Sequence, residues 1–135
     1  MASFSAELSI DGKLFPVLTV SYGLYQITDD TGKPSSGVRT YLIKLRLSGS
    51  DDETLTSWAV DAQKRLDGKI TFFRIDEQSK FKELSFEQAY CVEYTERVDP
   101  ADTTSQVLPG SFIIEIGISP AVLKIGETKH DNQWR

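Results

Sequence analysis

The sequence predicts an all-β domain, a barrel or compact sandwich of mostly antiparallel strands with one flanking α-helix. Apolar and polar residues alternate along most of the chain, as in strands that bury one face. A single segment has apolar residues at helical spacing. Clusters of Gly, Pro, Asp and Ser separate the alternating segments. Because the 135 residues show no repeat, linker or low-complexity segment, we expect one domain over residues 1–135.

Three strands are predicted in the first third of the chain, at residues 4–10, 18–24 and 41–47. Asp11-Gly12 follows the first strand and is a strong hairpin turn signal. Residues 28–37, rich in Asp, Gly, Pro and Ser, form a loop much longer than a usual hairpin connection. The apolar residues expected to share a face within each strand are Phe4, Ala6, Leu8, Ile10; Leu18, Val20, Tyr22, Leu24; and Tyr41, Ile43, Leu45, Leu47.

The helix is predicted near residues 51–65. Ser50 and Glu53 have the spacing of a capping box, in which each side chain bonds to the backbone of the other. The apolar stripe of this helix consists of Leu55, Trp58, Ala59 and Ala62. Asp67-Gly68 is then expected to turn the chain into the next strand.

The second half is predicted to be strands again. Residues 69–75 are apolar on both faces, with Phe73 and Ile75 opposite Ile70 and Phe72, so either the helix or a neighbouring subunit should cover the second face. A second long loop is expected at 97–110, then strands at 112–118 and 122–125 and a polar tail from Glu127. The long strand before that loop should turn Leu84, Phe86, Tyr90, Val92 and Tyr94 inward and Glu87, Cys91 and Glu93 outward.

Charge and composition exclude several classes of partner. With 20 acidic and 15 basic side chains the formal net charge is -5, which disfavours nucleic acid and anionic membrane surfaces. No apolar run approaches the roughly 20 residues of a membrane span. The N-terminus lacks the basic and apolar regions of a signal peptide, so we expect a cytoplasmic start and, for any export, a route other than general secretion. Cys91 alone excludes an internal disulfide.

Catalytic, cofactor and metal signals are weak, and we expect none of the three functions. His130 is the only histidine and lies in a polar segment, which favours a surface or interface role. Asp29-Asp30 and Asp51-Asp52 fit turn chemistry and a helix start better than paired acids. Gly32-Lys33-Pro34-Ser35 lacks the upstream glycine of a phosphate loop. Cys91 is expected to be a packed or interface thiol, and Trp58 a core residue.

Several short matches, in order along nearly the whole chain, resemble the type VI secretion tube protein family, called Hcp or TssD, in the divergent form typical of Bacteroidota. The most specific is the nine-residue run 31–39 between two strands. The other matches are Asp11-Gly12-Lys13, Ser21-Tyr22, Trp58, Asp67-Gly68, Lys82-Glu83-Leu84, Ala89-Tyr90, Glu93-Tyr94, Ile118-Ser119, Ile125-Gly126, His130 and Trp134.

This resemblance implies a phage tail-tube-like barrel that assembles with itself into hexameric rings. The rings stack into a hollow tube, which a contractile sheath propels, and effectors can ride in the lumen. Sheath, spike and baseplate proteins are further partners that the resemblance implies, as is export through the type VI apparatus. The long loop would contact a neighbouring subunit or ring through Thr31, Gly32, Lys33, Pro34, Ser35, Ser36, Gly37, Val38 and Arg39.

Two details concern the remaining surface of such a tube subunit. Phe73 is a candidate for the lateral contact within a ring, because its strand is apolar on both faces. Glu87, Glu93 and Glu115 are candidates for a wet lumen. Two alternatives remain open: a phage-derived tail tube protein, and a monomeric barrel that binds a small ligand in an apolar interior.

Overall fold

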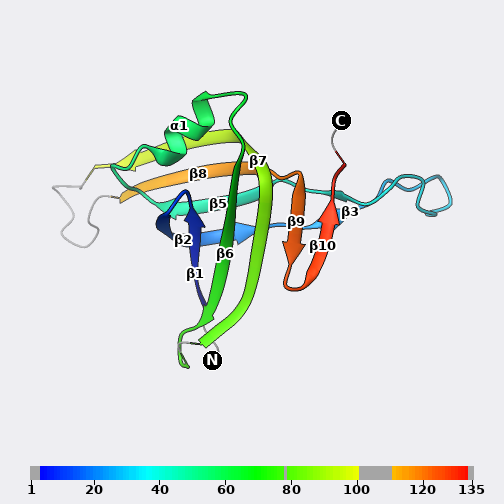
Figure 1. Ribbon diagram of the computed structural model, residues 1–135, viewed down its shortest axis with the longest axis horizontal. Helices are drawn as coiled ribbons and strands as arrows, with labels where there is room; N and C mark the ends of the chain where they lie inside the picture. Colours follow the sequence, from blue (N-terminus) through cyan, green and yellow to red (C-terminus); the bar gives the residue numbers. More distant parts are fainter. Residues whose placement is uncertain (1–3, 78, 101–110, 134–135) are drawn as a thin grey trace.

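A computed structural model describes residues 4–77, 79–100 and 111–133, and its strands close into an antiparallel β-barrel with one helix on its flank (Figure 1). The predicted fold class is thereby confirmed. In chain order the elements are β1 (Phe4–Ile10), β2 (Lys13–Ser21), β3 (Leu24–Tyr25), β4 (Arg39–Thr40), β5 (Ile43–Ser48), α1 (Thr54–Val60), β6 (Leu66–Arg74), β7 (Ser79–Asp99), β8 (Ser111–Ser119), β9 (Val122–Ile125) and β10 (Thr128–Asp131).

The barrel closes through the 21-residue strand β7. The pairing order runs β7-β6-β1-β2-β5-β8, and β8 returns to pair with β7. The first part of β7 pairs with β6 and β9, whereas its second part pairs with β8. The hairpin of β9 and β10 therefore extends the sheet beyond the barrel, and β3 and β4 form a separate two-stranded ribbon.

The barrel interior is filled by apolar side chains from every strand of the closed sheet. Their exposed fractions are 3% or less, so burial of apolar area drives this part of the fold. The buried residues are Leu8, Ile10, Phe15, Ile43, Leu45, Leu47, Leu55, Trp58, Ile70, Leu84, Phe86, Ala89, Ile114, Ile116, Ile118 and Leu123. Phe4 and Tyr41 were expected to share the buried face of their strands but are 50% and 56% exposed, because Phe4 is the first residue of β1 and Tyr41 lies before β5.

A bulge in β2 overturns one predicted face. The pairing of β2 with β5 shifts between Val17 and Thr19, so the alternation changes phase at Leu18. Leu18 is consequently 54% exposed, whereas Leu24, which is 43% exposed, lies in β3 and outside the barrel. The hairpin turn before this strand was predicted correctly: Asp11 and Gly12 both have positive φ and connect β1 to β2 as a two-residue loop.

A second bulge changes the phase of β7. Gln88 has φ 49°, and its backbone N–H donates to Oδ1 of Asp67 at 2.7 Å. Beyond it Ala89 is buried, Cys91 packs against the core and Val92 is 53% exposed, so Cys91 and Val92 have exchanged their predicted faces. Asp67-Gly68 is not a turn, because both residues lie within β6.

Helix α1 is shorter than predicted. Asp61 takes an extended conformation, and its side chain accepts from the N–H of Gln63 at 2.9 Å, which competes with continuing the helix. Ala62 is exposed as a result, while Leu55 and Trp58 are buried as expected. The Nε1–H of Trp58 donates to the carbonyl of Ala89 at 3.1 Å and ties the helix to β7.

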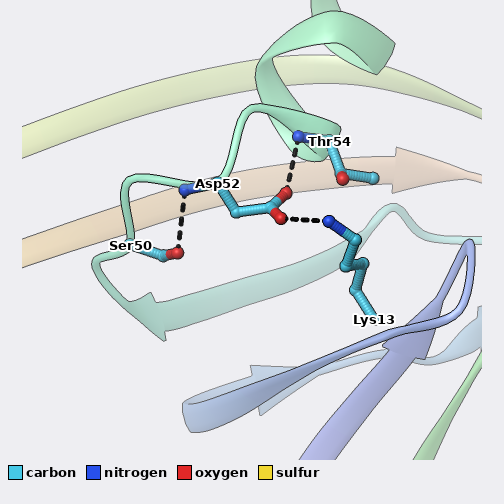
Figure 2. A network of polar contacts seen from close by, with 4 residues as sticks. All are labelled: Lys13, Ser50, Asp52 and Thr54. Atoms are coloured by element: carbon cyan, nitrogen blue, oxygen red, sulfur yellow. Dashed lines mark hydrogen bonds and ion pairs between the residues drawn. The ribbon is translucent and has the colours of Figure 1, made fainter.

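The predicted capping box is wrong, and a different network starts the helix (Figure 2). Glu53 makes no side-chain cap hydrogen bond. Instead the Oγ of Ser50 accepts from the N–H of Asp52 at 3.0 Å, and Oδ1 of Asp52 accepts from the N–H of Thr54 at 2.8 Å. The second carboxylate oxygen of Asp52 pairs with Nζ of Lys13, so the helix start is joined to the β1–β2 hairpin.

Two predicted irregular segments contain strand. Residues 97–99 belong to β7 rather than to the second loop, and β10 lies inside the predicted polar tail. Residues 101–110 of that loop, and Trp134, lie outside the described residues. No helix in the described part of the chain has the length and hydropathy needed to cross a membrane.

Candidate functional site

The predicted contact loop projects away from the barrel. We call residues 26–38, between β3 and β4, the arm; Figure 1 shows it as the cyan segment that extends beyond the sheets. Every residue of the arm except Ser36 is exposed. The structure therefore gathers residues 31–38 of the predicted contact set into one protruding element that does not pack on its own barrel, and Arg39 follows it as the first residue of β4.

Hydrogen bonds within the arm give it the shape of a narrow hairpin. Ser35 N–H donates to the carbonyl of Ile27 at 2.7 Å, and Ile27 N–H donates to Oγ of Ser36 at 2.9 Å. Thr28 and Pro34 form an isolated antiparallel bridge further along. The arm is consequently ordered by its own backbone rather than by a hydrophobic core.

The arm and its root carry charge of both signs. Asp30 and Lys33 in the arm and Arg39 at the start of β4 are exposed, and none of the ion pairs found among the described residues includes them. Ile27 and Val38 add exposed apolar side chains, at 47% and 41%. Charged and apolar groups on one protrusion suit a contact with another protein surface.

The root of the arm is fastened to the rest of the molecule. The rings of Tyr25 and Tyr41 lie 4.6 Å apart between centroids, and Tyr41 N–H donates to the carbonyl of Gly23 at 2.9 Å. Nδ2 of Asn132 donates to Oγ1 of Thr40 and to the carbonyl of Pro120, both at 2.8 Å. His130, whose Nε2 lies 3.2 Å from Oδ1 of Asn132, belongs to this anchor.

The outer face of β6, β1 and β2 contains Phe73. In β1, Ser5 and Ser9 are four residues apart and therefore lie on the same face of the strand. Ser5 pairs with Phe73 of β6 and Ser9 pairs with Leu14 of β2, so Phe73 and Leu14 share that face. Leu14 is 66% exposed and Ile75 51%. Phe73 and Ile75 line a hollow of about 280 Å³ with Ser5, Glu7 and Arg74. This surface offers apolar groups to a partner.

The outer face of β5, β8 and β7 is charged instead. Lys44 reaches Glu93 at 3.6 Å, and Glu115 lies 3.6 Å from Arg46 and 4.0 Å from Arg97. A groove of about 640 Å³ crosses this face, lined among others by Lys44, Arg46, Glu93 and Glu115. Of the three glutamates predicted for a lumen, Glu93 and Glu115 lie here, while Glu87 pairs with Val122 of β9 elsewhere.

A glycine makes the charged face possible at its centre. Gly117 lies between Lys44 and Glu93 in register, and a Cβ on it would come within 2.7 Å of Glu93 Oε1. Because glycine has no side chain, the ion pair between Lys44 and Glu93 can extend across β8 at this position. Neither Gly117 nor Asn132 was singled out from the sequence, since nothing local marks a residue whose partner lies on another strand.

The remaining chemistry-bearing groups lie apart from one another. Burial raises the pKa of the Cys91 thiol to about 11, which disfavours the thiolate that a nucleophile needs. Trp58 is a core residue, stacked at 6.4 Å on Phe86. Within the described ranges there is no group of three or more His, Cys, Asp or Glu side chains placed to hold a metal ion.

Comparison with known proteins identifies the family. A family model described as hemolysin coregulated protein Hcp (TssD) matches residues 2–135. Hcp1 from Flavobacterium johnsoniae is 30% identical, with a TM-score of 0.83 over 95% of this chain and 99% of that one. No curated protein matches the sequence.

Two more distant structures share the fold. Hcp1 from Salmonella typhimurium is 12% identical, with a TM-score of 0.68 over 91% of this chain and 85% of that one. A chain in the structure of the anti-feeding prophage baseplate is 11% identical, with a TM-score of 0.50 over 95% of each chain. By its family-model match and by its likeness to the Flavobacterium protein, the chain belongs to the Hcp (TssD) family.

Proposed function

We propose that this chain is a non-enzymatic structural subunit of the inner tube of a type VI secretion system. One tube domain, residues 1–135, joins copies of itself into hexameric rings that stack into a tube, and effectors travel in the lumen. Sheath, spike and baseplate proteins are its partners, and assembly in the cytoplasm precedes export through the apparatus. The arm is the observation that carries the proposal: a hydrogen-bonded protrusion with exposed apolar side chains is typical of a surface that contacts another protein.

The two outer faces supply the other contacts that a ring needs. Strand order puts β1 and β8 three strands apart in either direction, so the apolar face centred on β1 and the charged face centred on β8 lie across the barrel from each other. We assign the lateral contact to the face with Phe73, because apolar groups favour burial between subunits. On the charged face, acidic and basic side chains pair with one another and stay exposed to water, which suits a water-filled lumen.

The ligand-binding alternative needs an empty cavity inside the barrel. In this chain, apolar core side chains occupy the interior. Every closed strand contributes at least one interior side chain that is 3% exposed or less, and partly buried apolar side chains pack against these. The tail-tube alternative shares the proposed mechanism, and the likeness to the prophage baseplate chain bears on the fold alone. The genes beside this one would distinguish a secretion system from a phage tail.

The solution mass of the purified chain tests the proposal, measured by light scattering during size exclusion at micromolar concentration. We expect a species near six subunits. Phe73→Glu should shift it to monomer by placing a charge in the lateral contact, while Glu87→Lys, an exposed change on another strand, should leave it intact. A wild-type chain that elutes only as monomer would count against self-assembly.

A further inference from the structure

The tip of the arm is organised around one carboxylate. Oδ1 of Asp29 accepts three hydrogen bonds: from the N–H of Thr31 at 2.9 Å, from Oγ1–H of Thr31 at 2.7 Å and from the N–H of Lys33 at 3.0 Å. These bonds, the Thr31 hydroxyl first among them, hold the pKa of Asp29 below its usual range. The carboxylate is thus ionised at neutral pH, and its hydrogen-bond donors all belong to the same hairpin.

The backbone of the tip closes around the same residue. Asp29 N–H donates to the carbonyl of Lys33 at 2.9 Å, and Gly32 N–H donates to the carbonyl of Asp29 at 3.0 Å. Gly32 has φ 87°, a conformation that favours glycine. This is a three-residue hairpin loop, and Asp at its first turn position is a preferred residue because its side chain bonds to backbone two residues on.

Asp30 provides an internal contrast. It has the same charge, lies next in the chain and is exposed, but none of the side-chain hydrogen bonds or ion pairs described for the arm includes it. Of these two neighbouring acids, Asp29 is therefore the one whose side chain bonds to the tip.

An exposed hairpin without a core would otherwise be a mobile loop, and a mobile loop loses conformational entropy when it docks. We propose that Asp29 is a positioning residue that sets the arm tip in its docking conformation before subunits meet, so that the arm binds a second copy of this chain as a rigid hairpin. The docking half of this inference rests on the proposed function. The residue positioned most directly is Lys33, whose amide Asp29 holds.

Three single variants test the proposal: Asp29→Ala, Asp29→Asn and Asp30→Ala. The two alanine variants remove the same charge from neighbouring positions, whereas asparagine keeps an Oδ1 that can accept all three bonds. Amide hydrogen exchange at Thr31 and Lys33 reports order at the tip. Sedimentation velocity reports rings and stacked rings, and thermal unfolding reports the barrel.

We expect Asp29→Ala to speed exchange at both amides by about tenfold and to reduce stacked rings by a similar factor, with an unchanged melting temperature. Asp29→Asn should restore both, and Asp30→Ala should match the wild type. Wild-type exchange and stacking in Asp29→Ala would overturn the proposal. So would equal losses in the two alanine variants, or a failure of asparagine to restore stacking, because charge and not shape would then matter.

Failure of the proposed function would look different. A wild-type chain that never forms rings removes the docking half of the inference together with the tube assignment. Even in such a monomer, the amide exchange rates at Thr31 and Lys33 can be compared between Asp29→Ala and Asp30→Ala. Faster exchange in Asp29→Ala alone would still show that Asp29 orders the tip.

Discussion

The barrel and the arm are held together in opposite ways. The barrel buries apolar side chains to 3% exposure or less, whereas almost every residue of the arm is exposed and only hydrogen bonds define its shape. Stability of the chain therefore belongs to the barrel, and the capacity to contact another copy belongs to surfaces that contribute little to stability. Substitutions should therefore separate the two properties.

Trp58→Ala should have the largest effect on the barrel and none on the arm. Trp58 is fully buried, and its removal leaves a cavity under α1 and removes the hydrogen bond that the Ala89 carbonyl accepts from the indole. We expect a loss of about 3–5 kcal/mol in the free energy of unfolding, measured by chemical denaturation. Val60→Ala, on the same helix but 79% exposed, is the control and should change it by less than about 0.5 kcal/mol. A loss below about 1 kcal/mol for Trp58→Ala would contradict its place in the core.

The double variant Lys33→Glu, Arg39→Glu should have the converse effect. Both side chains are exposed, so the free energy of unfolding should stay within about 0.5 kcal/mol of the wild type. Stacking of rings, followed by sedimentation, should weaken because one positive charge in the arm and one at its root become negative.

The matched control is Lys82→Glu with Lys129→Glu, two exposed lysines outside the arm that give the same change in net charge. If the control weakens stacking as much as the arm variant does, the effect is one of total charge and the arm has no special part in it.

The same division explains how much of the fold the sequence could predict. Alternation is a local property of a strand that buries one face, so Leu8 and Ile10 in β1 or Ile43 and Leu45 in β5 were placed correctly. The errors in predicting which face of β2 and β7 is buried occur at irregularities, at Leu18 in β2 and at Gln88 and Val92 in β7. A bulge adds one residue and changes the phase of the alternation until another bulge restores it, and the partner strand that imposes it is distant in the sequence.

The site was predictable in part, for a different reason. The length and composition of residues 28–37 indicated a loop, and Asp29 followed by Gly32 matches the preferred residues of its turn. That the loop stands off the barrel as a hairpin depends on contacts at its root, where Asn132 bonds to Thr40 across 92 residues of chain. No local pattern encodes that contact.

Asn132→Ala should loosen the root of the arm while sparing the core. The variant removes two hydrogen bonds from Nδ2, to Thr40 and to Pro120, at a cost of about 1–2 kcal/mol in global stability. Amide exchange at Tyr41, whose N–H bonds to Gly23, should accelerate, while amides of the barrel core keep their relative protection. Gln133→Ala, exposed and one residue on, should leave both measurements unchanged. Equal exchange at Tyr41 in the two variants would show that Asn132 is not an anchor.

The smallest expected effect lies between these regions, at the polar network of Figure 2. The hydrogen bond from Lys13, together with the bonds from Thr54, lowers the pKa of Asp52 from 3.8 to about 2. A carboxyl whose pKa is lower in the folded chain stabilises it at pH above 3.8, and this contribution disappears as the pH falls through about 2. Because Asp52 is at the surface, salt and solvent screen the pair and the effect should be small.

Asp52→Asn isolates this contribution. The amide Oδ1 can still accept from the N–H of Thr54, so the helix start is kept and the ion pair with Lys13 is lost. Asp51→Asn, a neighbouring acid that is exposed and absent from the network, corrects for net charge. The stability difference between the two variants, from denaturant unfolding at intervals of pH, should be present at pH 6 and vanish toward pH 2. A difference that persists at pH 2 would mean that Asp52 acts there by geometry and not by its charge.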